Sequence, residues 1–119
     1  MWLSTKYGFF SIVCAHNDNG ESHPNLMMVR ARKEAHLEKL REFCPELGEI
    51  VHNKGTDYPC RIIAKRDVVI GMTTKLAADI DYNNFKNAAH DETPNDRDYL
   101  EFLHSVWGLG LHITPPNHR

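Results

Sequence analysis

Alternating hydrophobic and polar residues predict four β-strands in the first two thirds of the chain. Residues 7–14, "YGFFSIVC", are rich in β-forming side chains. Residues 26–32, "LMMVRAR", place Met, Val and Ala on one face and arginines on the other. Residues 60–66, "CRIIAKR", alternate in the same way, and residues 48–55 form a weaker fourth pattern. The polar stretch 15–25 predicts a long hairpin loop between the first two strands.

A helical period replaces the alternation in three other segments. The first is 33–44, where Leu37, Leu40 and Cys44 form an apolar stripe that ends before Pro45. A second helix follows the strand at 60–66, with Asp67 as its expected N-cap. Residues 81–90 predict a turn and at most a short helix. The last helix is expected over 94–109, with Thr93 as N-cap.

The order β-β-α-β-β-α-α predicts an α+β fold. We expect a single domain over residues 1–112, with a mainly antiparallel four-stranded sheet and helices on one face, followed by a flexible tail at 113–119. The second face of such a sheet is open unless a partner covers it.

Composition and charge narrow the class of protein. The chain has 119 residues, 41% hydrophobic and 25% charged, which is typical of a globular domain. Its longest apolar run near the N-terminus is too short to cross a bilayer, so we expect a cytoplasmic protein without a membrane partner. Three cysteines without C-x-x-C spacing indicate reduced thiols. The net charge of −2 disfavours nucleic acid as a partner.

The open face of the sheet is the first candidate surface. Aromatic and basic side chains alternate there, a combination that other modules use to stack bases and hold phosphates. The same pattern is also typical of a solvated surface or of a contact with a protein or a second copy. The predicted binding residues on this face are Tyr7, Phe9, Arg30, Arg32, Arg61 and Lys65.

A second candidate consists of three Asp-Tyr pairs. They are Asp57-Tyr58, Asp81-Tyr82 and Asp98-Tyr99. Asp side chains commonly bond their own backbone in turns, and this structural role alone explains such pairs. If the loops converge, they would form a polar pocket for a small ligand. The predicted binding residues of this polar loop are Asp81, Tyr82, Asn84 and Lys86.

Eight histidines raise the question of metal binding and catalysis. None has the local spacing of a zinc site, so we predict no metal and no cofactor. A histidine can act as a general base near neutral pH. Asp57, Asp81 and His104 are therefore weak catalytic candidates for a hydrolytic enzyme.

Several strings occur together and in order along the chain: "MWLSTKYGFFSIV", "VRAR", "DYPCRI", "IDYNNFK" and "LHSVW". With them the chain resembles a family of short, uncharacterised bacterial proteins. The resemblance implies a stand-alone cytoplasmic domain of bacterial or phage origin. It implies no particular activity, ligand or cofactor.

The leading hypothesis from sequence is a non-enzymatic binding or interaction module. Its open sheet face would engage a protein partner, a second copy of the chain or an anionic ligand. The alternatives are a small hydrolytic enzyme with a His/Asp/Tyr pocket and a single-stranded nucleic-acid binder.

Overall fold

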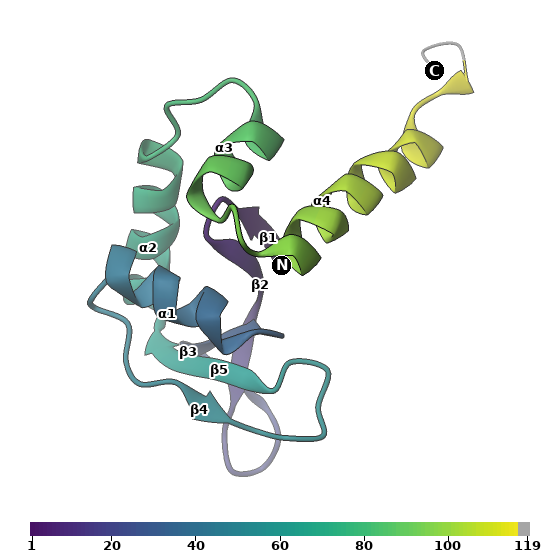
Figure 1. Ribbon diagram of the computed structural model, residues 1–119. Coiled ribbons are helices and arrows are strands. Elements are labelled where there is room, and N and C mark those ends of the chain that lie inside the picture. The colour runs from purple at the N-terminus through teal and green to yellow at the C-terminus, as the bar shows by residue number, and fades with distance from the viewer. Residues whose placement is uncertain (117–119) are drawn as a thin grey trace. The chain divides into compact units, whose positions relative to one another are not determined.

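The computed structural model describes residues 1–116 (Figure 1). Its internal contacts divide the chain into two compact units, Met1–Asp81 and Tyr82–Arg119. The first contains the sheet and two helices, and the second contains two more helices and a short 3-10 helix. Part of the predicted flexible tail, residues 117–119, lies outside the described residues.

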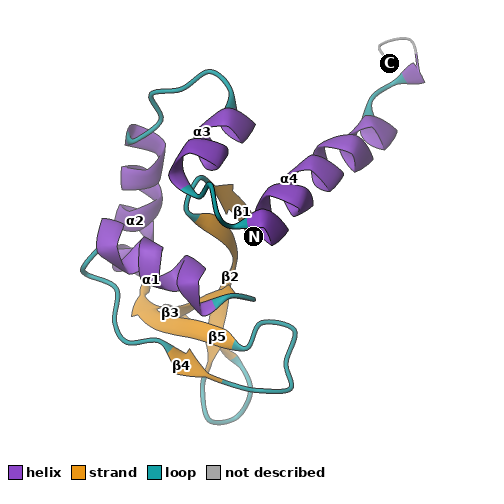
Figure 2. Cartoon of the chain, in the orientation of Figure 1, coloured by secondary structure: helices purple, strands orange, loops and turns teal. Residues whose placement is uncertain are grey.

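The sheet has five antiparallel strands, shown in orange in Figure 2. Their order across the sheet is β1-β2-β3-β5-β4. The α+β class is confirmed, with one strand more than the four predicted. The strands are β1 (Trp2–Thr5), β2 (Gly8–His16), β3 (Ser22–Ala31), β4 (Val51–His52) and β5 (Cys60–Lys65).

Strand β1 is the strand that hydrophobic patterning misses. It has four residues and pairs with β2 through a two-residue turn. The Thr5 hydroxyl holds this turn: it donates to the Gly8 carbonyl at 3.0 Å and accepts from the backbone N–H groups of Tyr7 and Gly8. A local side-chain bond of this kind leaves no periodic signal in the sequence.

Strand boundaries differ from the prediction in two other places. The loop predicted at 15–25 is shorter, because β2 continues to His16 and β3 begins at Ser22. Side-chain oxygens of Asn17 and Asn19 accept from the Glu21 backbone N–H and stabilise the turn between them. The strand predicted at 48–55 is reduced to the two residues of β4.

Helices α1 and α2 belong to the first unit. They are α1 (Glu34–Phe43) and α2 (Arg66–Ala78). The N-cap prediction for Asp67 is wrong, since α2 follows β5 directly and Lys65 occupies the cap position. Asp67 lies instead in the first turn, where its carboxylate faces the positive end of the helix dipole.

Helices α3 (Phe85–Glu92) and α4 (Arg97–Gly110) belong to the second unit, and η1 (Leu111–Ile113) follows α4 directly. Thr93 is not the N-cap of the last helix. Its hydroxyl donates to the Ala89 carbonyl at 2.8 Å and so closes α3. The N-cap of α4 is Asp96, whose carboxylate accepts from the Tyr99 N–H at 3.3 Å.

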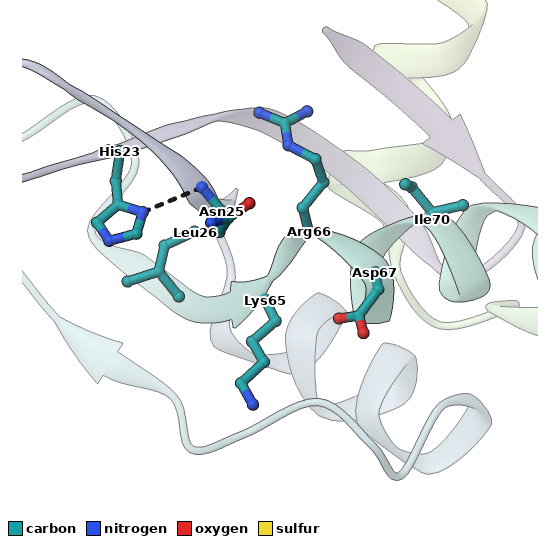
Figure 3. A pocket seen from close by; sticks show the side chains of 7 residues that line it. All are labelled: His23, Asn25, Leu26, Lys65, Arg66, Asp67 and Ile70. Atoms are coloured by element: carbon teal, nitrogen blue, oxygen red, sulfur yellow. Dashed lines mark hydrogen bonds between the residues drawn. The ribbon is translucent and has the colours of Figure 1, made fainter.

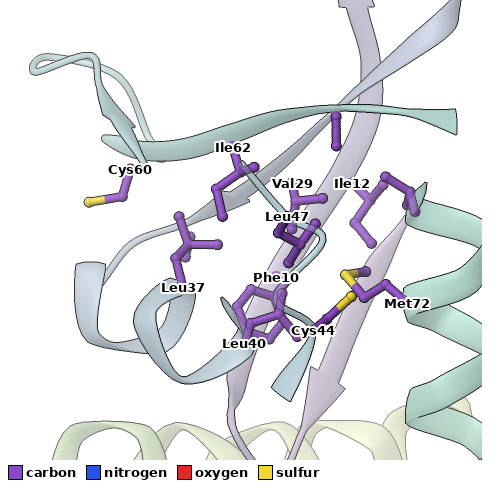
Figure 4. Packing of buried hydrophobic residues seen from close by; sticks show 13 residues of the cluster. Phe10, Ile12, Val29, Leu37, Leu40, Cys44, Leu47, Cys60, Ile62 and Met72 are labelled. Carbon is purple, nitrogen blue, oxygen red and sulfur yellow. The ribbon is translucent and has the colours of Figure 1, made fainter. Parts of the chain in front are cut away.

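The core of the first unit lies between the sheet and its two helices (Figure 4). Ile12, Val29 and Ile62 are paired across three neighbouring strands, which places them on one face of the sheet. Leu37 and Leu40 of α1 and Met72 of α2 pack against this face and have no exposed surface. Each such buried side chain stabilises the fold by roughly 1.5–3 kcal/mol. The residues between them along each strand must therefore point to the opposite face.

Within residues 1–116, no helix has both the length and the apolar character that crossing a bilayer requires.

Candidate binding surface on the sheet

The register of the strands defines one row of side chains across the whole sheet. Trp2 pairs with Ser11, Ser11 with Arg30, Arg30 with Arg61, and Arg61 with Val51. Directly paired residues share a face, so this row lies opposite the core. We call this side of the sheet the outer face. Its positions in the paired strands are Trp2, Ser4, Phe9, Ser11, Val13, Leu26, Met28, Arg30, Val51, Arg61, Ile63 and Lys65. None of them is acidic.

Tyr58 lies among the arginines of this face. Tyr58 is 8% exposed, and the centre of its ring lies 4.8 Å from the guanidinium carbon of Arg30 and 5.0 Å from that of Arg32. A nitrogen of the Arg61 guanidinium donates to the Tyr58 carbonyl at 3.1 Å and to the Thr56 hydroxyl at 3.2 Å. Cation–π contacts of this kind contribute about 0.5–2 kcal/mol each. We call Arg30, Arg32, Tyr58 and Arg61 the Arg–Tyr cluster.

The arginines of the cluster form no ion pair with the described residues. Among residues 1–116, none of its three arginines has a carboxylate within 4.0 Å. Arg30 donates instead to the Ser11 hydroxyl at 2.7 Å, and Arg61 contacts the Met28 sulfur at 3.7 Å. The Nε atoms of Arg30 and Arg61 are buried and, among the described residues, have no hydrogen-bond partner. A buried donor of this kind costs about 1–3 kcal/mol.

Phe9 and Trp2 form the aromatic part of the outer face. Their ring centres are 6.0 Å apart in an edge-to-face arrangement. Phe9 is half-buried, whereas Trp2 is 74% exposed. The prediction that Phe9 lies on the outer face agrees with its register opposite Ser4.

Tyr7 does not belong to the outer face, contrary to the prediction. It lies in the turn between β1 and β2, and its ring packs against Phe43 of α1 with ring centres 4.9 Å apart. Its hydroxyl donates to the Asp79 carboxylate at 2.9 Å. The alternation that placed Tyr7 outward fails because β2 begins only at Gly8. Lys6, 3.1 Å from the same carboxylate, and then Tyr7 lower the pKa of Asp79 through their hydrogen bonds.

A hollow of about 580 Å³ adjoins the outer face where Leu26 pairs with Lys65 (Figure 3). Arg66 lines it and is held in place, since it donates to the Pro24 carbonyl at 2.9 Å and to the Cys14 sulfur at 3.5 Å. The hollow is basic on balance and extends the positive charge of the sheet face. Its lining residues are His23, Asn25, Leu26, Lys65, Arg66, Asp67 and Ile70.

The two buried cysteines show no sign of activation. Burial, followed by the bond from its thiol to Glu46 at 3.2 Å, raises the pKa of Cys44. Burial likewise raises the pKa of Cys60. A raised pKa lowers the fraction of reactive thiolate at neutral pH.

The predicted polar loop crosses the boundary between the two units. Asp81 ends the first unit and is exposed. Asn84 is the N-cap of α3, and its side-chain oxygen accepts from the Asn87 N–H at 3.0 Å. The Lys86 ammonium lies 4.5 Å from the centre of the Trp107 ring. Asn84 thus has a folding role, and Lys86 contacts an aromatic ring of α4.

The weak catalytic candidates are not gathered within one unit. Asp57 is exposed in the loop before β5, and His104 stacks on Trp107 within α4. The structure does show a histidine–carboxylate pair, His52 Nε2 at 3.1 Å from Glu34 Oε1, but it is exposed and uses neither candidate. Within residues 1–116, no three His, Cys, Asp or Glu side chains are grouped to hold a metal ion.

Sequence reasoning misses two residues of the surface, whereas alternation places Ser11 on the outer face correctly. The residue pattern places Tyr58 in an Asp-Tyr turn and puts Trp2 outside the first strand. Only the pairing register brings Trp2 and Ser11 into one row with the arginines. The one sequence feature that bears on Tyr58 is Pro59, because the residue before a proline favours an extended backbone.

Comparison of the chain with protein-family models, with curated proteins and with solved structures gave no match. The resemblance to a bacterial family therefore stays a prediction from its motifs.

Proposed function

We propose that the protein is a non-enzymatic binding module whose outer sheet face binds an acidic segment of a partner protein. The observation that carries the proposal is the Arg–Tyr cluster. Two arginines lie over one buried ring and a third donates to the carbonyl of the same tyrosine, with no carboxylate within 4.0 Å of them among residues 1–116, on a sheet face that neither α1 nor α2 covers.

The chemistry of guanidinium favours a carboxylate ligand. Its planar fork forms paired hydrogen bonds with carboxylate or phosphate groups. Tyr58 orients Arg30 and Arg32 before any ligand arrives, which reduces the conformational entropy lost on binding. Trp2, Val51 and Ile63 are exposed by 74%, 44% and 48%, so the same face also offers apolar contacts. A peptide with acidic and apolar side chains suits this combination.

Nucleic acid fits the surface less well. The first unit carries eleven Lys and Arg and eleven Asp and Glu, so its formal net charge is zero. Binding of a polyanion depends on the release of counterions by many cations. A stacking surface also needs several accessible rings. Tyr58 is buried beneath guanidinium groups, and Tyr7 packs on α1.

The cost of the arginines to folding supports a binding role. Among residues 1–116 the buried Nε atoms of Arg30 and Arg61 have no hydrogen-bond partner, and a buried donor left unpaired typically costs about 1–3 kcal/mol. Residues that lower stability in this way are typical of functional surfaces.

A peptide selection tests the proposal and does not require that the partner be identified first. The probe is a random dodecapeptide library displayed on phage and panned against the full chain. We expect enriched peptides that are rich in Asp and Glu, with affinities that fall when salt is raised from about 50 to about 300 mM. The double substitution Arg30→Met with Arg32→Met should weaken binding of the best peptide at least about 10-fold, which corresponds to about 1.4 kcal/mol.

Lys39→Met with Arg41→Met is the matched control, since it removes the same charge from α1, which packs on the core face of the sheet. It should leave the affinity unchanged. An enriched set without acidic residues, or equal losses in both double variants, would refute the proposal. Tighter binding of a 20-nucleotide oligothymidine than of the best peptide would identify the surface as a nucleic-acid binder instead.

The hydrolytic alternative and the cytoplasmic location stay hypotheses. The histidine–carboxylate pair that the structure describes involves none of the predicted catalytic residues.

A further inference from the structure

Basic and apolar side chains alternate along strand β5 on the outer face. Arg61, Ile63 and Lys65 lie at every second position of the strand, whereas the side chains of Cys60 and Ile62 between them belong to the core. Side chains at every second position of a strand share one face and stand about 6.6 Å apart. The two basic positions are therefore about 13 Å apart along the strand, with the isoleucine midway.

The neighbouring strand β3 repeats this order. The partners of the three residues on β3 are, in the same sequence, Arg30, Met28 and Leu26. Val13 on β2 pairs with Met28 and extends the apolar row. Because paired residues share a face, the surface has a row of two arginines at one end, an apolar row in the middle and a row with one lysine at the other end.

Lys65 is the second positive anchor of this surface. Among residues 1–116 it has no carboxylate within 4.0 Å. It occupies the N-cap of α2 but forms no side-chain cap hydrogen bond, so its side chain does not help to start the helix. Figure 3 shows Lys65 and Arg66 pointing away from each other, and Arg66 is held by the Pro24 carbonyl and the Cys14 sulfur. At this end of the outer face, Lys65 alone is left for a ligand.

The spacing of the anchors suits an extended chain rather than a helix. An extended segment rises about 3.3 Å per residue, so its side chains i, i+2 and i+4 cover the same length of about 13 Å. These three side chains also lie on one side of the segment, where they can face the sheet together. A helix rises only about 1.5 Å per residue and would need about nine residues to cover this length.

We propose that the partner segment binds in an extended conformation along β3 and β5, with the pattern acidic-x-apolar-x-acidic. The inference rests on the proposed acidic ligand and adds the conformation and the order of its side chains. One acidic group faces the paired Arg30 and Arg61. The apolar residue lies over Ile63, where a carboxylate would lose water without gaining a partner. The second acidic group faces Lys65.

Nuclear magnetic resonance titration of the full chain with three peptides of identical composition tests this pattern. Their central sequences are ESLSE, ELSSE and EESLS, each flanked by Gly and Ser. Moving Leu by one position turns it away from the apolar row, and adjacent acidic residues cannot reach both anchors. We expect ESLSE to bind at least about 10-fold more tightly than either rearranged peptide, which corresponds to about 1.4 kcal/mol.

A charge exchange tests the second anchor. Lys65→Glu should weaken the binding of ESLSE about 5-fold, and the peptide ESLSK should recover this loss in the same variant. The variant should fold like wild type, because the Lys65 side chain forms no cap bond. Lys39→Glu is the matched control. It makes the same change of charge on α1, which packs on the core face of the sheet, and should leave the affinity for ESLSE unchanged.

The possible failures of this inference and of the proposed function are distinguishable. Equal affinities for the three peptides would overturn the extended pattern and leave the acidic ligand in place, as would an affinity for ESLSE that Lys65→Glu does not change. Tighter binding of a helical peptide with its acidic residues nine positions apart would also overturn the pattern alone. Absence of binding by every acidic peptide at about 1 mM, where dissociation constants near 1 mM are still detectable, would overturn both proposals.

Discussion

Two glycine-to-alanine substitutions should have opposite effects on stability, and the pair tests how the first hairpin packs on α1. A Cβ atom added at Gly8 would lie 2.4 Å from Cγ and 2.6 Å from Cβ of His36. His36 cannot easily move away, because it is 5% exposed and its Nδ1 accepts from the Phe9 N–H at 3.4 Å. At Gly71 in α2, an added Cβ meets no atom within 4 Å.

The expected magnitudes follow from these surroundings. Forcing an extra methyl group into a filled site costs about 1–3 kcal/mol. Displacing His36 also loses its bond to the backbone of β2, which contributes about 1 kcal/mol. Gly8→Ala should therefore lower the free energy of unfolding by about 2–4 kcal/mol, a large part of the roughly 5–15 kcal/mol typical of a domain. Gly71→Ala should raise it by about 0.5–1 kcal/mol through helix propensity.

Urea unfolding followed by far-ultraviolet circular dichroism measures both changes. The two variants differ from wild type by the same single methyl group, so only its surroundings can separate them. A Gly8→Ala protein within about 0.5 kcal/mol of wild type would refute the close contact with His36, since changes of that size are usual at ordinary surface sites. A lower free energy of unfolding for Gly71→Ala would contradict the position of Gly71 inside helix α2, with open space beside it.

Two further predictions concern titratable groups. Because the folded-state pKa of Asp79 lies below its unfolded value, its pair with Lys6 stabilises the fold above about pH 4 and is lost as the pH falls through the folded pKa. Asp79→Asn should lower the free energy of unfolding by about 0.5–1 kcal/mol at pH 7 and by less near pH 2, and equal losses at both values would contradict the pairing. Timed alkylation with iodoacetamide, read by mass spectrometry, should label Cys44 and Cys60 more slowly than half-buried Cys14. Labelling of Cys44 as fast as that of Cys14 would contradict its burial.

The candidate surface was only partly predictable. The alternation in 26–32 and 60–66 placed Arg30 and Arg61 outward correctly, because side chains of a strand alternate whatever its neighbours are. The same rule failed for Tyr7, since alternation holds only inside a strand and Tyr7 lies in a turn. Tyr58 could not be assigned to the surface, because a loop residue has no register until the chain has folded.

The sequence by itself determined the α+β class, the extent of α1 to within a residue or so, and the inward face of each long strand. These features depend on local periodicity, which a chain carries before it folds. The tertiary structure alone decided the fifth strand, the row from Trp2 to Val51 and the meeting of three arginines with Tyr58. Those features depend on pairing between residues distant in sequence, where the hydrogen bonds of the sheet, rather than any local pattern, select the neighbours.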